Sequence, residues 1–401
     1  MKYSRHYQCD VNLVKSAIIS SLLFLSIAPT LSQASKPEPQ LTQQTSQNII
    51  SNNYHPKIQI AILLDTSGSM DGLIDQARNQ IWQAVNEFAK AKHNGVRPTL
   101  EVALYEYGND GLSKKKGFTR KVLGLSNDLD KVSEALFSLT TNGGSEYCGY
   151  AIKSATLNLA WSPEKNDIKA IFIAGNEPFS QGPVQFRSAI KHAKTKGITV
   201  NTIHAGSYNN GIQSGWMEGA TLASGSYMNI DHNQKVVHII APQDKQIAML
   251  NTQLNQTYVP YGKKGREGAS RQLSQDTKTN SISAGLLAKR AKSKVSSLYN
   301  SASWDLVDAL EKKTIKLEDV KERDLPVVMK PMSSVKRKAY LDKQLKQRKN
   351  IKQEISRLSN ARDAYIAKKK TQSVVKEGKT LDKALIQAIH KQGNKKSYVF
   401  E

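Results

Sequence analysis

Short apolar runs alternate with segments of helical periodicity between residues 57 and 230. The first run, residues 58–64, is too short for a helix and rich in β-branched residues, which favours a buried strand. The same patterns predict strands at 100–105, 168–174, 198–204 and, at an edge, 226–230, and helices at 73–88, 129–139, 150–161, 184–196 and 211–223. Strands that alternate with helices predict an α/β fold, a Rossmann-like and mostly parallel sheet with helices on both faces.

A short polar turn follows the first predicted strand. Its sequence, Asp-Thr-Ser-Gly-Ser, places three hard oxygen ligands close together, from Asp65, Ser67 and Ser69. Mg²⁺ prefers six oxygen ligands in an octahedron and keeps several waters among them. One carboxylate with two hydroxyls would leave such a cation strongly Lewis acidic, so an open coordination position would take an anionic oxygen from a partner. The turn also lies where parallel sheets bind ligands, beyond the carboxyl ends of the strands.

Residues 60–70, Ile-Ala-Ile-Leu-Leu-Asp-Thr-Ser-Gly-Ser-Met, resemble the start of a von Willebrand factor type A domain with its metal-ion-dependent adhesion site. The resemblance extends over residues 56–258. It implies that Asp65, Ser67 and Ser69 bind a divalent metal, Mg²⁺ in the first place with Mn²⁺ or Ca²⁺ as alternatives. It also implies that the metal holds a protein or another acidic ligand. The alternative for the turn alone is a serine-rich helix cap.

Two further loops of the family carry metal ligands. The second loop has a hydroxyl residue, usually Thr, after two glycines, and Asn-Gly-Gly-Ser at 142–145 matches it with Ser145. An N-cap is the alternative role for Ser145, and both roles are compatible. The third loop departs from the family pattern Thr-Asp-Gly, because Gly175 stands at the position of the Asp. Asn176 or Glu177 is then the replacement, with Glu177 the candidate carboxylate ligand, and this version looks like one found in secreted bacterial members.

The N-terminal 34 residues have the pattern of a secretory signal peptide. A basic leader precedes an apolar run at 16–28, and small residues at 32 and 34 favour cleavage after Ala34. The alternatives are a buried helix or a retained anchor, but the run is shorter than the roughly 20 residues of a spanning helix. We therefore expect a secreted, periplasmic protein with no transmembrane helix in the mature chain. Residues 35–55, rich in Gln, Ser, Thr and Asn, are expected to form a disordered leader.

Positive charge gathers in the C-terminal third of the chain. From residue 261 onward there are 34 Lys and Arg against 15 Asp and Glu. We expect a flexible basic linker at 259–280 and a basic helical, coiled-coil-like region at 281–401, with one long helix over 335–370. This region could contact an anionic envelope component, or its charges could be an ordinary solvated face. Aromatic residues are too sparse there to support base stacking, so no specific nucleic-acid partner is expected.

The sequence contains no recognisable set of catalytic residues. No motif pairs a nucleophile with a base, and Cys148, the lone cysteine of the mature chain, is expected to be a small buried residue. Two functional hypotheses follow. In the first, the chain is a metal-dependent adhesion-type binding module of the cell envelope. In the second, it is an envelope or polyanion-binding structural protein that acts through its basic helices, with a vestigial metal site.

Overall fold

The computed structural model describes residues 54–231, 239–372 and 379–401. The predicted signal peptide (1–34) and nearly all of the predicted leader (35–55) lie outside these residues. Within the described segments, no helix combines the length and the apolar character needed to cross a membrane.

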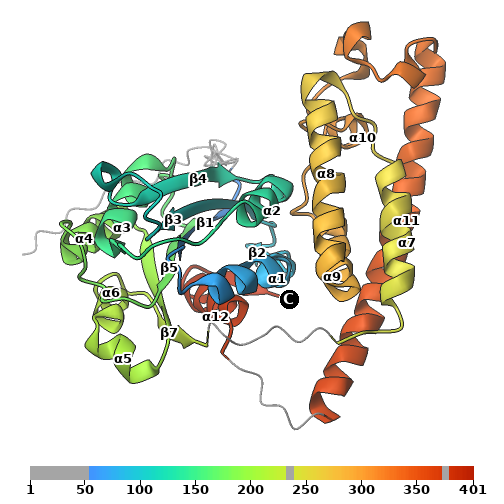
Figure 1. Ribbon diagram of the computed structural model, residues 1–401. Helices are drawn as coiled ribbons and strands as arrows, with labels where there is room; N and C mark the ends of the chain where they lie inside the picture. The colour runs from blue at the N-terminus through green and yellow to red at the C-terminus, as the bar shows by residue number, and fades with distance from the viewer. Residues whose placement is uncertain (1–53, 232–238, 373–378) are drawn as a thin grey trace, which may run out of the picture. The chain divides into compact units, whose positions relative to one another are not determined.

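A six-stranded sheet forms the centre of residues 54–231 (Figure 1). Its strands are β1 (Lys57–Asp65), β3 (Thr99–Tyr107), β4 (Thr119–Ser126), β5 (Ile168–Gly175), β6 (Thr199–Ala205) and β7 (Tyr227–Ile230). Their order is β4-β3-β1-β5-β6-β7, and all neighbours pair in parallel except β3 and β4. The predicted α/β fold with a mostly parallel sheet is confirmed, whereas the antiparallel edge strand β4 was not predicted.

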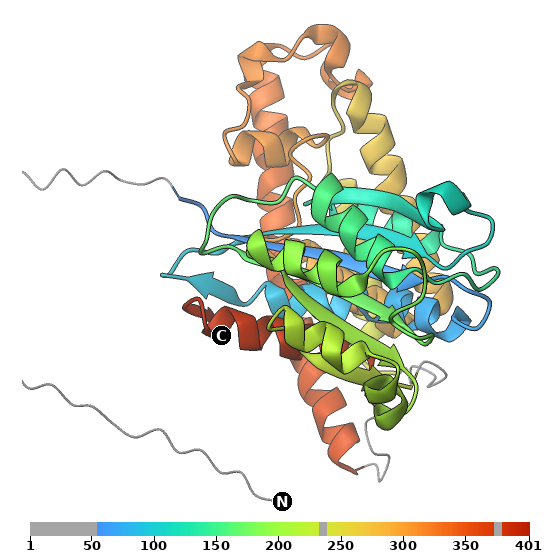
Figure 2. The same cartoon turned by 90° about the vertical axis from the view of Figure 1, so that its left-hand side faces the viewer.

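Helices cover both faces of this sheet. One face is covered by α1 (Asp71–Phe88), α2 (Leu129–Phe137) and α12 (Leu381–Asn394); the other, turned to the viewer in Figure 2, by α3 (Cys148–Asn158), α4 (Phe186–Thr195) and the successive short helices α5 (Tyr208–Gln213) and α6 (Trp216–Leu222). Successive side chains of a strand point to opposite faces. Accordingly Ile62 packs with the first helix layer, and Leu63 packs with the second.

The C-terminal residues return to the α/β domain. Helix α12 packs beside α1 and contacts β5 and β6, and its Leu385 and Ile389 share one core with α1. Strand β8 (Tyr398–Phe400) pairs antiparallel with β2 (Ala91–His93). The predicted region at 281–401 is helical as expected, but its last two elements, α12 and β8, complete the sheet domain. Residues 239–372 are an insertion between β7 and α12.

Helix α8 (Gly262–Ile282) occupies most of the predicted linker at 259–280, so that prediction was wrong. The glycines that suggested flexibility are packing positions. A Cβ atom added at Gly268 would lie 2.3 Å from Cγ of Trp304, and one at Gly265 would lie 2.9 Å from the backbone of Pro260. Glycine is needed here so that the helix can approach its neighbours closely.

The remaining helices of the insertion are α7 (Asp244–Gln256), α9 (Ala284–Val295), α10 (Leu306–Glu311) and α11 (Ser334–Gln372), with short 3-10 helices at Leu317–Asp319, Glu322–Asp324 and Val327–Met329. A further 3-10 helix, Lys114–Lys116, lies in the sheet domain. Helix α11 confirms the long helix predicted over 335–370. Four of its buried residues, Leu341, Arg348, Ile355 and Arg362, follow one another at intervals of seven. The two arginines are ion-paired at 2.6 Å, with Asp305 and Asp244 respectively.

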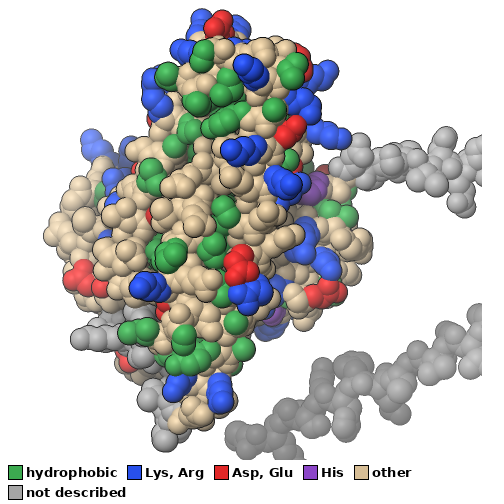
Figure 3. Space-filling model, turned by 90° about the vertical axis from the view of Figure 1, so that its right-hand side faces the viewer, with side chains coloured by type: hydrophobic (Ala, Val, Ile, Leu, Met, Phe, Trp, Pro, Cys, Tyr) green, Lys and Arg blue, Asp and Glu red, His purple; other side chains and the backbone are tan. Residues whose placement is uncertain are grey.

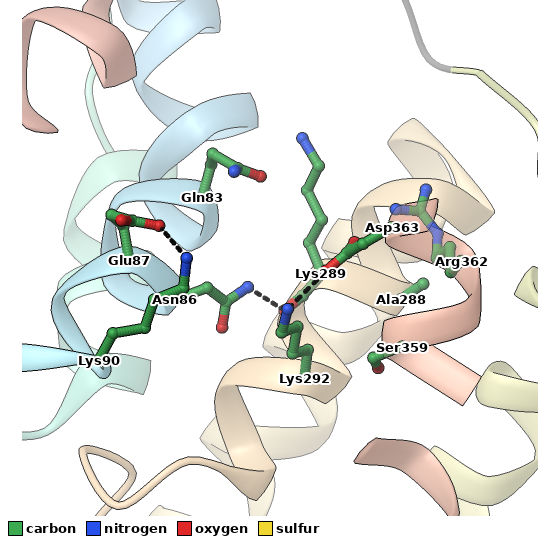
Figure 4. A pocket seen from close by; sticks show the side chains of 10 residues that line it. All are labelled: Gln83, Asn86, Glu87, Lys90, Ala288, Lys289, Lys292, Ser359, Arg362 and Asp363. Carbon is green, nitrogen blue, oxygen red and sulfur yellow. Dashed lines mark hydrogen bonds and ion pairs between the residues drawn. The ribbon is translucent and has the colours of Figure 1, made fainter. Parts of the chain in front are cut away.

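Helix α9 joins the insertion to the sheet domain. The guanidinium of Arg290 is fully buried and forms ion pairs of 2.6 Å with Asp130 of α2 and Asp276 of α8. It also lies over the ring of Trp82 in α1, 4.9 Å from the centroid. A cleft of about 90 Å³ lies between α1, α9 and α11. There the side-chain amide of Asn86 in α1 donates to the carbonyl of Lys289 at 3.0 Å (Figure 4). Buried polar contacts therefore fix α9 against α1 and α2.

Candidate metal centre

Three loops meet beyond the carboxyl ends of β1, β3 and β5. The turn after β1 is tied to the second loop, because the amide of Gly68 donates to the carbonyl of Gly143 at 2.8 Å. The residue after β3, Gly108, forms a backbone bridge with Ser145. Gly175, the last residue of β5, lies beside the side chain of Asp65. The structure thus brings together the three loops that the sequence singled out.

Asp65 provides the carboxylate at the centre of this site. Its side chain is completely buried at the end of β1, and Oδ1 accepts a hydrogen bond from the amide of Ser67 at 2.8 Å. The other oxygen, Oδ2, is buried and has no hydrogen-bond partner among the described residues. Burial raises the pKa of the Asp65 carboxyl above its ordinary value. A buried polar atom without a partner is costly, and a bound cation would remove that cost.

The two predicted serine ligands lie next to each other. The hydroxyls of Ser67 and Ser69 are 3.4 Å apart. Ser69 also accepts a hydrogen bond of 3.3 Å from the side-chain amide of Asn176, in the third loop. The carbonyl oxygen of that same side chain, Oδ1, is buried and unpaired within the described part of the chain. Asn176 therefore adds an available oxygen at the edge of the serine pair.

The other two predicted ligands lie around this centre. Ser145 is half-buried, and its backbone is held beside Gly108. Glu177 is half-buried as well, and its carbonyl accepts a hydrogen bond of 2.9 Å from the indole nitrogen of Trp216. Its negative charge is close enough to contribute to the raised pKa of Asp65. Glu177 is thus placed near the site, with its backbone anchored to α6.

Glu146 is a second buried carboxylate that the sequence analysis did not single out. A Cβ atom added at Gly108 would lie 2.6 Å from Oδ1 of Asp65 and 2.8 Å from Cγ of Glu146, so the two side chains flank the same point. Burial in the first place, and then the charge of Asp65, raise the pKa of Glu146 well above its ordinary value. Its position directly after Ser145 was the signal available in the sequence. Two adjacent carboxylates repel each other unless a proton or a cation lies with them.

The surroundings of Gly175 leave no room for the Asp side chain that the family carries at this position. A Cβ atom there would lie 2.4 Å from the hydroxyl oxygen of Tyr107 and 3.0 Å from Oδ2 of Asp65. The Tyr107 hydroxyl is buried and donates to the carbonyl of Ala174 at 3.0 Å, so it has little freedom to move aside. Cys148, which was expected to be buried, packs at 3.7 Å against the same hydroxyl. The tyrosine fills the space that a third-loop side chain would need.

The donor set fits a hard divalent cation. It consists of oxygens only: two carboxylates, serine hydroxyls and an amide carbonyl, which are the ligands that Mg²⁺, Mn²⁺ and Ca²⁺ prefer. Across the described segments, no three His, Cys, Asp or Glu side chains gather in a way that could hold a metal ion. A cation here would therefore depend on the hydroxyls of Ser67 and Ser69 as well as on the two carboxylates.

Residues 59–218 match the family model described as von Willebrand factor type A domain, so the chain contains such a domain. Similar solved structures include BatB from Bacteroides thetaiotaomicron (18% identity, 43% of this chain and 90% of that chain, TM-score 0.33) and the SpRpn10 VWA domain (16% identity, 45% and 99%, TM-score 0.32). Another is proximal thread matrix protein 1 from the mussel byssus, with a zinc-occupied MIDAS motif (13% identity, 44% of this chain and 42% of that chain, TM-score 0.32). The chain spans less than half of that mussel protein. No curated protein matches the chain.

Proposed function

We propose that the von Willebrand factor type A domain of this chain is a metal-dependent binding module of the adhesion type. Asp65, Ser67 and Ser69 would hold a divalent cation, with Ser145 in the second loop and Glu177 in the third contributing at its margin. The observation that carries the proposal is the buried Oδ2 of Asp65 at the meeting point of the three loops, which has no hydrogen-bond partner in the part of the chain that the structure describes. The bound metal would supply a Lewis-acidic position that accepts an oxygen from a protein or another acidic ligand.

The cation in this proposal is Mg²⁺ in the first place, with Mn²⁺ or Ca²⁺ as alternatives. All three are hard cations that suit a set of carboxylate, hydroxyl and amide oxygens. The absence of sulfur and imidazole from the proposed ligands disfavours a soft metal.

We further propose that the protein is a secreted bacterial member of its family and works in the periplasm. The support is the signal-peptide pattern of residues 1–34. We also propose that it binds without catalysing a reaction. The one thiol of the described residues, Cys148, is completely buried, and burial raises its pKa, which disfavours the reactive thiolate.

The second candidate function is binding of an anionic envelope component by the helical insertion. The balance of 29 Lys and Arg against 13 Asp and Glu in residues 239–372 favours it. Four of these cations, Arg290, Lys294, Arg348 and Arg362, are buried in ion pairs and unavailable to a ligand. Figure 3 shows the blue Lys and Arg side chains dispersed among other surface groups on that face of the molecule, without a continuous stripe. This candidate therefore ranks second.

Capture from envelope extract with immobilised residues 35–401 tests the two candidates. The intact chain is required, because α12 and β8 complete the sheet domain and a cut near residue 260 would remove them. A metal-dependent module should retain its partner in Mg²⁺ and lose it when a chelator or Asp65→Ala is introduced. Salt should matter little, because a direct metal–oxygen contact is poorly screened at a Debye length of about 8 Å.

The opposite result has an equally clear signature. The first proposal would be overturned if the partner stayed bound in chelator and to Asp65→Ala but was released as salt increased. That result would favour binding by the helical insertion. The matched variant is Lys343→Gln/Lys346→Gln/Lys368→Gln, three exposed lysines of α11. It should release the partner in the second case and keep it in the first.

A further inference from the structure

A broad groove lies at the end of the sheet opposite to the metal centre. It has a volume of about 650 Å³ and is bounded by the chain segments after α3 and around the end of α4, by the start of β5 and by the C-terminal Lys396. Its cationic side chains are Lys165, Lys169, Lys194, Lys196 and Lys396, and we call it the lysine groove. Lys169 and Gly175 are six residues apart on β5, so roughly 20 Å separate the groove from the metal centre. Figure 2 faces the sheet side on which α3 and α4 lie.

Five lysines line the groove, and the carboxylates that act on Lys169 are those of Asp167 and Glu164. No Asp or Glu is among the described residues that line it. The ammonium of Lys169, a residue only 6% exposed, donates to the carbonyl of Ser162 at 2.8 Å, and that of Lys396 donates to the carbonyl of Lys165 at 2.7 Å. Carbonyl oxygens satisfy the hydrogen bonds of an ammonium but leave its full charge in place.

Asp167 is a buried carboxylate next to the groove. Oδ1 of Asp167 accepts hydrogen bonds from the hydroxyl of Tyr54 at 2.5 Å and the amide of Lys57 at 2.8 Å. Burial, and then the nearby charge of Lys169, lower the pKa of Lys396, although Asp167 acts in the opposite direction. The ammonium groups of Lys169 and Lys396 thus repel each other, and Asp167 compensates for part of this repulsion.

Part of the lining of the lysine groove is apolar. Leu159, Ala160, Trp161 and Pro163 line it. The indole nitrogen of Trp161 donates to the carbonyl of Ala155 at 3.1 Å, which fixes the orientation of the ring. A rigid aromatic ring beside several cations suits a ligand that has an apolar face and carries anionic groups.

We infer that the lysine groove binds an acidic oligosaccharide, with a sugar ring against Trp161 and its carboxylate, sulfate or phosphate groups held by the lysines. The volume of the groove exceeds what a single inorganic anion needs. One aromatic ring does not make the series of stacking platforms that single-stranded nucleic acid uses. This site is separate from the metal centre, so the inference does not depend on the proposed metal function.

Isothermal titration of residues 35–401 with a heparin-derived hexasaccharide tests the inference. The groove variant is Lys165→Gln/Lys194→Gln/Lys196→Gln, in which three exposed lysines change and the buried Lys169 stays. The control is Lys343→Gln/Lys346→Gln/Lys368→Gln, which lowers the net charge equally but lies on α11. We expect at least a tenfold loss of affinity in the groove variant and less than a twofold loss in the control, with both melting like the wild type.

Three probes identify the ligand class. Neutral maltohexaose should not bind, and inorganic phosphate at equal concentration should not displace the hexasaccharide. Vesicles of phosphatidylglycerol should bind the groove variant and the wild type alike. Chelator and Asp65→Ala should leave hexasaccharide binding unchanged, which separates this site from the proposed metal function.

The inference is overturned by any of four outcomes. These are no binding of the hexasaccharide, an equal loss in both lysine variants, full displacement by phosphate, or vesicle binding that is lost only in the groove variant. As a further check, Trp161→Leu should weaken binding of the hexasaccharide even in high salt, whereas Trp161→Phe should retain most of the affinity. Equal binding by both Trp161 variants and the wild type would remove the aromatic wall from the site.

Discussion

The carboxylates of Asp65 and Glu146 flank the one point at which a side chain on Gly108 would begin. They come from the end of β1 and from the second loop, whereas the acidic residue of the third loop, Glu177, lies at the margin of the site. Gly108 keeps a positive φ of 82°, which glycine adopts without strain. This arrangement gives the site two buried carboxyl groups despite the missing Asp at position 175.

Glu146→Gln should weaken Mg²⁺ and Mn²⁺ binding by about tenfold or more, since tenfold corresponds to about 1.4 kcal/mol. The amide keeps the size of the side chain but removes one of the two charges beside the cation. Glu177→Gln is the matched control and should weaken binding less, because Glu177 lies at the margin. Titration calorimetry measures both, and a larger effect at Glu177 would assign the second carboxylate to the third loop.

Millimolar Mg²⁺ should raise the melting temperature of the wild-type protein, because a ligand of the native state stabilises it by about 2.7 kcal/mol at a hundred times its Kd. Asp65→Ala should abolish that gain. Differential scanning calorimetry with and without chelator is the measurement. A wild-type melting curve that metal leaves unchanged would make the site vestigial.

Gly175→Ala should destabilise the protein by about 1–3 kcal/mol, the usual cost of overpacking a filled core. The added methyl group would meet the Tyr107 hydroxyl at 2.4 Å. Gly124→Ala in β4 is the control, since a Cβ atom there would meet no described residue within 4 Å apart from its chain neighbours. Urea denaturation compares the two variants, and equal stability would show that Tyr107 can move. Gly175→Asp, for the same steric reason, should not strengthen metal binding.

Acid should destabilise the helical insertion through Asp276. Burial alone would raise the pKa of this carboxyl, but the charges of Lys294 and Arg290 outweigh burial and bring it well below its ordinary value of 3.8. Because the pKa is lower in the folded state than in the unfolded state, the ionised Asp276 stabilises the fold above pH 4. This contribution to the free energy of unfolding is lost as the pH falls further. Urea denaturation at pH 6 and pH 3 should show this loss. Asp276→Asn should be less stable at pH 6 and less sensitive to acid, whereas exposed Glu318→Gln should follow the wild type.

The sequence pattern predicted those strands and helices whose signal lies within the segment itself. The apolar run at 58–64 predicted β1 because a buried parallel strand is apolar on both faces. Strand β4 was missed because Arg120 and Lys121 are exposed at the sheet edge and break the apolar signal. The glycines of α8 suggested a linker because their close contact with Trp304 and Pro260 is tertiary.

The candidate site divides in the same way. Asp65, Ser67 and Ser69 lie within one turn, so their spacing alone was informative. Glu146 was overlooked because its relation to Asp65 exists only after the loops following β1, β3 and α2 have met. The clash between a side chain at position 175 and Tyr107 likewise involves two different strands, so the sequence of neither strand alone could predict it.

The pairing of α1 with α12 sets the order in which the chain can fold. Ile74 and Leu385 belong to the same core but are separated by some three hundred residues, which include the whole insertion. Long-range contacts of this kind slow folding, because the entropy of closing the intervening chain is lost before the contacts form. A chain that ends anywhere before α12, whether by incomplete synthesis or by proteolysis, would leave the apolar side of α1 uncovered. Such fragments should associate with each other or be degraded, so the sheet domain matures only once its last residues have been made.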